Sequence, residues 1–213
     1  LSDVNIAGAL NSLNLYQYLN NLNKKSSAGN TFNYNTGETN LIGGIVRAAI
    51  GDNLSNYLEK KIWKPFGMEF NAYWVIDTDY EQELGGCCLN ATLRDYAKFG
   101  LLYLQNGEWN ENQILSEQWI NDSHYASGAH LVPGERETSS NPWGYGYQWW
   151  IPGPGVSDYT AHGIYNQFIY VNPESGVVIA KTSSNFNFIE ERQYTKDAHI
   201  AIFRAIAKSI SEK

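Results

Sequence analysis

Residues 164–182, IYNQFIYVNPESGVVIAKT, decide the fold class that this sequence favours. Two runs rich in β-branched and aromatic residues, 164–171 and 177–182, flank the segment NPESG at 172–176. Such runs favour strands, and a short connection containing Asn, Pro and Gly favours a tight turn. The stretch therefore predicts an antiparallel hairpin.

Segments on either side of the hairpin have a different character. A third run of strand type lies at 145–151. Before Pro142, apolar residues recur at helical spacing, which predicts helices. These helices are expected from Thr39 to Gly51, from a cap at Asp52 to Pro65, from a cap at Thr92 to Gly107, and at 116–120 after a cap at Ser116. A further helix is expected after the hairpin, at 194–206 near the C-terminus.

Helices followed by antiparallel strands and a covering C-terminal helix predict an α+β fold. The sequence has 213 residues, a length typical of one domain or of one domain with an added lobe. We expect a connector over 1–30, a mostly helical lobe over 31–142, and an antiparallel sheet with its terminal helix over 143–213.

Composition excludes several classes of protein. With 15 Lys and Arg against 22 Asp and Glu, the net charge is −7 and no basic stripe is present, which argues against nucleic-acid binding. No apolar run approaches the roughly 18 residues that a membrane span needs. The four histidines, His124, His130, His162 and His199, lack metal-ligand spacing, so no metal or cofactor is predicted.

The only two cysteines, Cys87 and Cys88, are adjacent in the sequence. Neighbouring Cα atoms lie closer together than ordinary disulfide geometry requires. We therefore expect free thiols, with a redox-active disulfide between neighbours as the alternative.

Two short segments combine polar or titratable side chains with glycine. In 32–37, FNYNTG, Tyr34 stands immediately before a predicted helix, where a phenol with a lowered pKa can move protons. In 161–164, AHGI, His162 stands at the expected entry to a strand, and a backbone N–H there can stabilise an oxyanion. The structural alternative is an ordinary turn with packed side chains.

The order of five segments resembles the serine β-lactamase and penicillin-binding-protein-like family, in its class C, esterase and 6-aminohexanoate-dimer-hydrolase branch. The family has a Ser-x-x-Lys motif, then a Tyr motif, then a Lys-Thr-Gly-type strand. The five similar segments are 32–43, FNYNTGETNLIG; the turn Gly85-Gly86 with 91–100, ATLRDYAKFG; 145–150, YGYQWW; 161–167, AHGIYNQ; and 168–182. This resemblance implies a β-lactamase/transpeptidase-like fold.

The resemblance also implies site residues. Tyr34 takes the place of the proton-shuttling Tyr, and Thr36 that of its polar partner. Gly163 takes the place of the strand-motif glycine, and the N–H of Ile164 that of an oxyanion-hole donor. His162 is expected to hydrogen-bond substrate. Aromatic residues that can line an acyl pocket, or else belong to the core, are Tyr147, Trp149, Trp150 and Tyr165.

Two departures from the family pattern stand out. No Ser in this chain is followed three residues later by Lys, so we expect the nucleophile and its Lys in an N-terminal segment outside this chain, and the fold to be incomplete there. Ala161 stands where the family has Lys, which favours esters or amides over β-lactams as the small-molecule substrate.

Two other functions stay open from the sequence. One is a non-catalytic homologue that binds peptide or cell-wall fragments in the same cleft. The other is a carbohydrate-binding module, against which the predicted helices argue. The resemblance implies a periplasmic or secreted parent protein, and the sequence itself leaves the compartment open.

Overall fold

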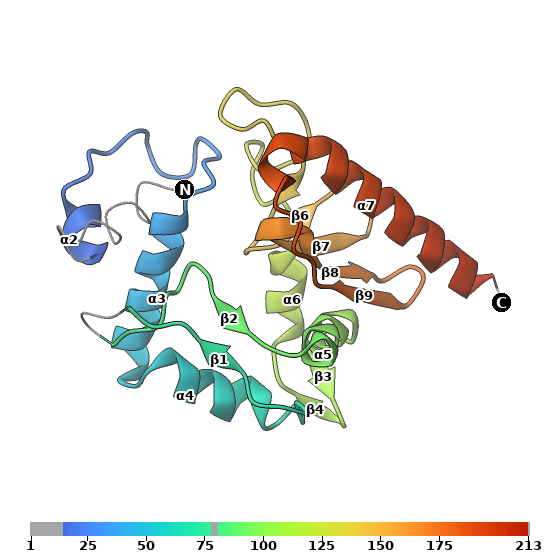
Figure 1. The fold of residues 1–213 in the computed structure, drawn as a ribbon, viewed down its shortest axis with the longest axis horizontal. Coiled ribbons are helices and arrows are strands. Elements are labelled where there is room, and N and C mark those ends of the chain that lie inside the picture. The colour runs from blue at the N-terminus through green and yellow to red at the C-terminus, as the bar shows by residue number, and fades with distance from the viewer. Residues whose placement is uncertain (1–14, 78–80, 213) are drawn as a thin grey trace. The chain divides into compact units, whose positions relative to one another are not determined.

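A computed structural model describes residues 15–77 and 81–212 of the chain (Figure 1). The chain divides into two compact units, residues 1–91 and 92–213. Helices occur in both units, and the second contains an antiparallel sheet of five strands, which confirms the α+β prediction.

The first unit is mainly helical. Its longest element, α3 (Thr36–Ile50), begins three residues earlier than predicted because Asn35 caps it, accepting hydrogen bonds from the backbone N–H groups of Gly37 and Glu38. Gly51 ends it in a left-handed conformation with φ 62°, as predicted. The described residues of this unit also form α2 (Leu15–Asn20), α4 (Leu54–Leu58), the π-helical turn η1 (Glu59–Trp63), and the short hairpin of β1 (Tyr73–Trp74) and β2 (Leu89–Asn90).

The cap of α4 differs from the prediction by one residue. Asn53, and not Asp52, accepts the hydrogen bond from the Asn56 N–H. The Asp52 carboxylate instead accepts hydrogen bonds from the side chains of Asn56 and Lys60. Both residue types are good caps, so the sequence alone gave no reason to prefer the second.

The second unit is built on a sheet with the order β5-β6-β7-β8-β9, in which all neighbours are antiparallel. Asn172 pairs with Val177 across the turn between the last two strands, which confirms the predicted hairpin. The elements of this unit are α5 (Leu93–Leu104), β3 (Glu108–Trp109), β4 (Asn112–Gln113), α6 (Glu117–Ser123), β5 (Gly144–Tyr145), β6 (Trp150–Ile151), β7 (Tyr159–Gly163), the 3-10 turn η2 (Ile164–Asn166), β8 (Gln167–Asn172), β9 (Val177–Lys181) and α7 (Phe188–Ser211).

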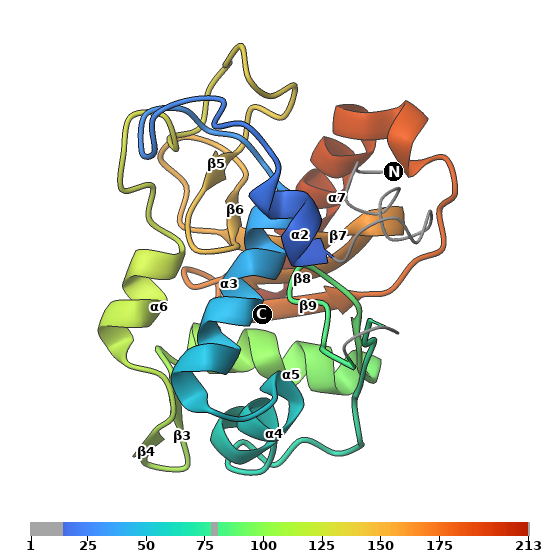
Figure 2. The same cartoon turned by 90° about the vertical axis from the view of Figure 1, so that its left-hand side faces the viewer.

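Helices α5 and α7 cover opposite faces of this sheet (Figure 2). Successive strand residues point to opposite faces, so Ile169 and Phe168 lie on different sides. A Cβ atom added at Gly100 of α5 would lie 2.8 Å from the Ile169 side chain, which shows how closely that helix approaches. On the other face, the ring of Phe203 in α7 lies 5.5 Å from that of Phe168.

Two predicted strands are shorter than expected because the backbone turns within them. The run 145–151 forms β5 and β6 with a reversal between them, where Gln148 has φ 68°. The run 164–171 begins as the turn η2, and β8 starts only at Gln167. The terminal helix α7 is longer than the predicted 194–206.

Aromatic rings fill the core of the second unit. Trp149 is 3 % exposed and Tyr159 1 %, and their ring centroids lie 5.1 Å apart. Both belong to a cluster with Tyr103, Ile120 and Val171. Helix α5 contributes to this core, so its contacts group it with the sheet, although the change in sequence character had suggested a division at residue 142.

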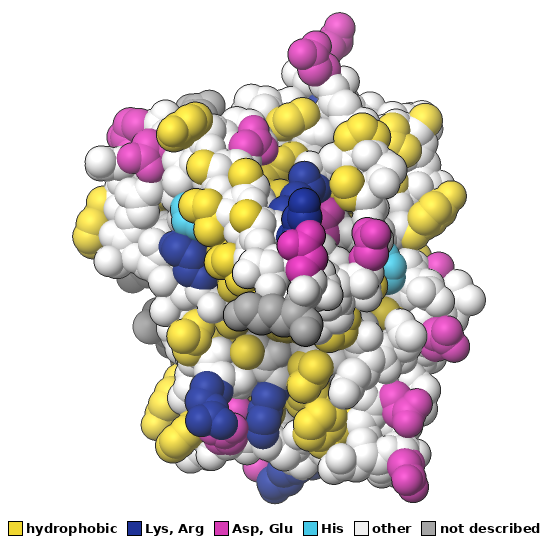
Figure 3. Space-filling view, turned by 90° about the vertical axis from the view of Figure 1, so that its right-hand side faces the viewer, with side chains coloured by type: hydrophobic (Ala, Val, Ile, Leu, Met, Phe, Trp, Pro, Cys, Tyr) yellow, Lys and Arg dark blue, Asp and Glu magenta, His cyan; other side chains and the backbone are white. Residues whose placement is uncertain are grey.

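Hydrophobic side chains also reach the surface among charged and polar ones (Figure 3). Three of them, Ile202, Ile206 and Ile210, follow each other at four-residue intervals along α7 and are 57 %, 42 % and 52 % exposed. None of the helices formed by residues 15–77 and 81–212 is both long and apolar enough to span a membrane.

Candidate active site

Tyr34 lies in the first unit, directly before the cap of α3. Its side chain is 56 % exposed, so the phenol is accessible at the N-terminal end of the helix. Partial removal from water raises the pKa of this phenol. The described residues therefore do not lower the Tyr34 pKa, and the proton-moving role of Tyr34 stays a prediction.

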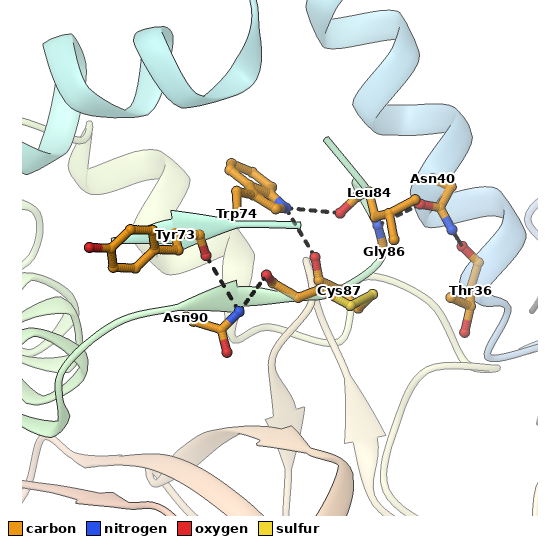
Figure 4. Close-up of a disulfide and its surroundings, with 9 residues drawn as sticks. Thr36, Asn40, Tyr73, Trp74, Leu84, Gly86, Cys87 and Asn90 are labelled. Carbon is orange, nitrogen blue, oxygen red and sulfur yellow. Dashed lines mark hydrogen bonds between the residues drawn. A yellow bond between two sulfur atoms is a disulfide. The ribbon is translucent and has the colours of Figure 1, made fainter. Parts of the chain in front are cut away.

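Thr36 begins α3 and is tied to the Gly85-Gly86 turn through one buried side chain. The Asn40 amide donates to the Thr36 carbonyl oxygen at 3.0 Å, and its Oδ1 accepts the Gly86 N–H at 2.9 Å (Figure 4). Asn40 is 5 % exposed. Sequence reasoning missed this residue, although a polar side chain four residues after Thr36 on the same helix face was a visible signal.

Glycine is required at this turn because two backbones nearly touch. A Cβ atom added at Gly85 would lie 2.9 Å from the Cα of Gly43 in α3. The pair of glycines thus lets the segment approach the helix close enough for the Asn40 contact.

Cys87 and Cys88 follow this turn and form a disulfide with each other, so the prediction of free thiols is wrong (Figure 4). The prediction rested on the short distance between neighbouring Cα atoms, and the disulfide forms here although that distance is 3.7 Å. Cys88 has a left-handed backbone with φ 77°. Both residues are exposed.

In the second unit, Ala161, His162 and Gly163 end β7 instead of beginning a strand. Gly163 pairs with Gln167, and the three residues between them form the turn η2. Tyr165 and Asn166 have φ 60° and 64°, so the chain reverses within that turn and leaves Ile164 at its start with a 60 % exposed side chain. The structure therefore brings His162, Gly163, Ile164 and Tyr165 together at one end of the sheet.

Three contacts hold this turn. Lys181 Nζ on β9 donates to the Asn166 carbonyl oxygen at 3.1 Å, and the Asn185 N–H donates to the Tyr165 carbonyl oxygen at 3.4 Å. The Asn166 side chain is buried, with Oδ1 3.4 Å from Nε2 of His162. Asn166 and Lys181 had no predicted role, although the tolerance of Asn for positive φ was a usable signal.

The His162 ring packs among aromatic side chains. Its centroid lies 4.7 Å from that of Phe168 and 6.5 Å from that of Trp143. Burial, assisted by the charge of Lys196, lowers the pKa of His162 to about 4. The imidazole is therefore neutral near pH 7, with one nitrogen available to donate and the other to accept.

The predicted acyl-pocket aromatics differ in exposure. Tyr147 is 46 % exposed, and its ring lies 5.1 Å from that of Trp119. Trp149 and Trp150 are 3 % and 6 % exposed, so both are buried in the structure, as the core alternative had it. The Tyr165 ring packs against Phe188, with centroids 5.1 Å apart.

No group of three or more His, Cys, Asp or Glu side chains within residues 15–77 and 81–212 is arranged to hold a metal ion. The candidate residues of the first unit are Tyr34 and Thr36 at the start of α3. The candidate residues of the second unit lie in the turn after Gly163.

Residues 3–202 match the Beta-lactamase family, which covers nearly the whole chain. The chain belongs to this family. A "6-aminohexanoate-dimer hydrolase" of Paenarthrobacter ureafaciens is 26 % identical over 171 residues, which is 79 % of this chain and 43 % of that protein. A solved structure, "Putative 6-aminohexanoate-dimer hydrolase from Bacillus anthracis", is 31 % identical with a TM-score of 0.80, covering 93 % of this chain and 49 % of that one.

More distant structures of this fold are also similar. A penicillin-binding protein homologue from Caulobacter crescentus is 12 % identical with a TM-score of 0.62, covering 80 % of this chain and 58 % of that one. Such a likeness shows the fold alone, and it confirms the predicted β-lactamase/transpeptidase-like architecture. The chain spans about half the length of the 6-aminohexanoate-dimer hydrolases that it matches.

Proposed function

We propose that this β-lactamase-family chain is the C-terminal part of a serine hydrolase that cleaves esters, amides or β-lactams through an acyl-enzyme. The nucleophilic Ser and its Lys belong, in this proposal, to a segment outside residues 1–213. The observation that carries it is the braced turn after Gly163, which lies in the segment where the family resemblance puts an oxyanion-hole donor. The absence of Ser-x-x-Lys within the chain agrees with catalytic residues that come partly from this chain and partly from another segment.

In the proposed reaction, the catalytic groups act in order. The Ser oxygen attacks the substrate carbonyl carbon, while its proton passes to the Lys and Tyr34. The tetrahedral intermediate collapses as the bond to the leaving group breaks, and the leaving group takes that proton. Water then attacks the acyl-enzyme in the same way and releases the acid, which restores the Ser hydroxyl.

Ile164 contributes its backbone N–H to the negative oxygen of the tetrahedral intermediate. A donor fixed in place before the reaction needs no reorganisation when the charge develops, and this fixed geometry makes an oxyanion hole effective. The hydrogen bonds from Lys181 and Asn185 to the turn carbonyls support such rigidity. Neutral His162, one residue before Gly163, is proposed to hydrogen-bond the substrate, and exposed Tyr147 to contact its acyl group.

Esters and amides are favoured among the substrates. Ala161 supplies no cation to pair with the carboxylate of a β-lactam, so such a substrate would lose a charge-assisted contact. Hydrolysis of an amide agrees with the names of the two 6-aminohexanoate-dimer hydrolases that the chain resembles.

The alternative is a non-catalytic homologue that keeps the cleft for binding peptide or cell-wall fragments. The lack of Ser-x-x-Lys in residues 1–213 also agrees with this function. Fluorophosphonate labelling of the full-length protein, read by intact mass, separates the two. One adduct on a Ser outside residues 1–213 is expected for the hydrolase. A folded full-length protein with no adduct would overturn it.

The same experiment on residues 1–213 alone serves as the control. This chain should show no adduct and no esterase or β-lactamase turnover, because it lacks the activated nucleophile. Burst release of product from this chain, traced to one of its own residues, would contradict the division of the site that we propose.

A further inference from the structure

The disulfide of Cys87 and Cys88 occupies an exposed position next to the Gly85-Gly86 turn. A thiol has to approach a disulfide sulfur directly to exchange with it, and the exposure of both cysteine residues favours such an approach from solution. A disulfide that stabilises a fold by closing a long loop joins residues far apart in sequence. This one joins neighbours, so any effect it has is confined to the local backbone.

The carbonyl groups of the two cysteines are held by the β1–β2 hairpin. The Trp74 indole donates to the Cys87 carbonyl oxygen at 3.0 Å (Figure 4). The Cys88 carbonyl oxygen accepts from the Val75 N–H at 3.1 Å and from the Asn90 amide at 2.9 Å. If the backbone of Cys88 changes conformation, either the residues before it move or these hydrogen bonds break.

Cys88 has a backbone conformation that its residue type disfavours. A φ of 77° is in the left-handed region, which costs a residue other than Gly or Asn free energy. The disulfide ring restrains Cys88 together with the hydrogen bonds to its carbonyl oxygen, and reduction removes the restraint of the ring. Once two separate thiols replace the ring, Cys88 can return to an ordinary conformation with negative φ.

The segment before the cysteines connects to the candidate site. Gly86 donates to Asn40, and Asn40 donates to the carbonyl oxygen of Thr36 at the start of α3. Asn40 is buried, so water competes little for either of these hydrogen bonds. The Asn40 side chain alone thus links the Gly86 N–H to the start of α3, so a displacement of this N–H changes the hydrogen bond to Thr36. Thr36 is two residues after Tyr34.

We propose that the Cys87–Cys88 pair is a reversible thiol–disulfide exchange site whose oxidation state sets the geometry of the Thr36 end of α3. The relevance of this geometry to catalysis rests on the proposed function of Tyr34. The geometric coupling itself is independent of it. A dithiol is the chemical class of reductant that fits a closed, exposed pair of this kind.

The dithiol reduces the protein disulfide in two exchange steps. A thiolate of the dithiol attacks one cysteine sulfur, forms a mixed disulfide with it, and displaces the other cysteine as a thiolate. The second thiol of the reductant closes its own ring and releases the first cysteine. The dithiol loses two electrons and two protons, and the protein gains two thiols.

Hydrogen–deuterium exchange of the full-length protein, read by mass spectrometry with and without dithiothreitol, tests the coupling. On reduction, exchange is expected to accelerate roughly twofold to tenfold in peptides covering 84–90 and 35–42, the range that corresponds to losing one hydrogen bond. Peptides from α5 should not change. Thiol alkylation of the Cys87–Cys88 peptide verifies each oxidation state.

Two variants sharpen the test. The double variant Cys87→Ser/Cys88→Ser should exchange like the reduced protein whether or not dithiothreitol is present. Asn40→Asp keeps an oxygen acceptor for the Gly86 N–H and removes the donor to Thr36. It should therefore retain the response at 84–90 and lose it at 35–42.

Identical exchange in the oxidised and reduced proteins would overturn the proposal, as would two free thiols in protein oxidised in air. A full response at 35–42 in Asn40→Asp would overturn the route through Asn40. Fluorophosphonate labelling in parallel keeps the proposed function separate. If fluorophosphonate labels neither the oxidised nor the reduced protein, the proposed hydrolase function is contradicted, whereas the hydrogen–deuterium exchange result still tests the coupling.

Discussion

Arg204 donates two hydrogen bonds to the carboxylate of Asp158, from Nε to Oδ2 at 2.7 Å and from Nη2 to Oδ1 at 2.9 Å. The Tyr170 hydroxyl, from the sheet, donates to the same Oδ2 at 2.8 Å. The Asp158 side chain is 4 % exposed, whereas that of Arg204 is 40 % exposed. One nearly buried carboxylate therefore joins the terminal helix to the sheet that carries the turn after Gly163.

Replacing this carboxylate should destabilise the protein. For Asp158→Ala we expect a loss of about 2 to 4 kcal/mol in the free energy of unfolding, because the buried Tyr170 hydroxyl and the Arg204 guanidinium lose their acceptor. Urea unfolding followed by fluorescence measures it. Lys208→Ala, which breaks the exposed pair with Glu212 on the same helix, should cost less than about 1 kcal/mol. Equal losses in both variants would contradict the assigned role.

Acid should destabilise the protein in part through His162. Its pKa is about 4 when folded and 6.5 when unfolded, so between these values the unfolded chain binds more protons. The contribution of neutral His162 is therefore complete above pH 6.5 and is lost as the pH falls toward 4. In His162→Phe the melting temperature should fall less steeply over this range. Burial also lowers the pKa of His124, so some dependence should persist. An unchanged slope would refute the assignment.

Tyr34→Phe removes the phenolic proton and keeps the ring. If Tyr34 moves protons in the full-length hydrolase, kcat should fall by about 10²-fold or more. Tyr73→Phe, which alters a 74 % exposed tyrosine of the same unit, is the matched control and should retain activity. Near-normal turnover by Tyr34→Phe would exclude the proposed role.

Ile164→Pro deletes the backbone N–H that we assign to the oxyanion. Removal of one such donor is expected to lower kcat by about 10²- to 10³-fold. Ile164→Val keeps the N–H and alters only a 60 % exposed side chain, so its activity should match the wild type. Circular dichroism establishes that both variants fold. Activity retained by folded Ile164→Pro would place the oxyanion donor elsewhere.

Local signals in the sequence predicted the helices well. Thr92 accepts the Asp95 N–H and begins α5, and Ser116 accepts the Trp119 N–H and begins α6, both as expected. These caps act within one turn of helix, so residue types and spacing suffice to find them. The hairpin of β8 and β9 was predicted for the same reason.

Features that depend on backbone reversals were predicted poorly. The left-handed residues Gln148, Tyr165 and Asn166 divide runs that read as continuous strands. Tertiary contacts, such as that of Lys181 with Asn166, stabilise such residues, and a linear pattern does not contain them. Cys88 is a further case, because the sequence indicated neither its positive φ nor its disulfide with Cys87.

The candidate site shows the same division. The family resemblance predicted roles for Tyr34, Gly163 and Ile164, which stay predictions, whereas the polar contacts near these residues came only from the structure. Asn40 and Asn166 are both buried amides that bond to backbone or to a neighbouring side chain. The sequence held two signals for them, the position of Asn40 four residues after Thr36 and the tolerance of Asn for positive φ, but neither signal shows that an amide is buried.

The row of Ile202, Ile206 and Ile210 on α7 has a consequence for how the protein behaves in solution. A surface that covers these side chains binds the folded helix and not the unfolded chain, so it stabilises the folded state by mass action. If copies of the chain cover one another, the thermal midpoint rises with protein concentration. The measured stability would then depend on the protein concentration as well as on the sequence.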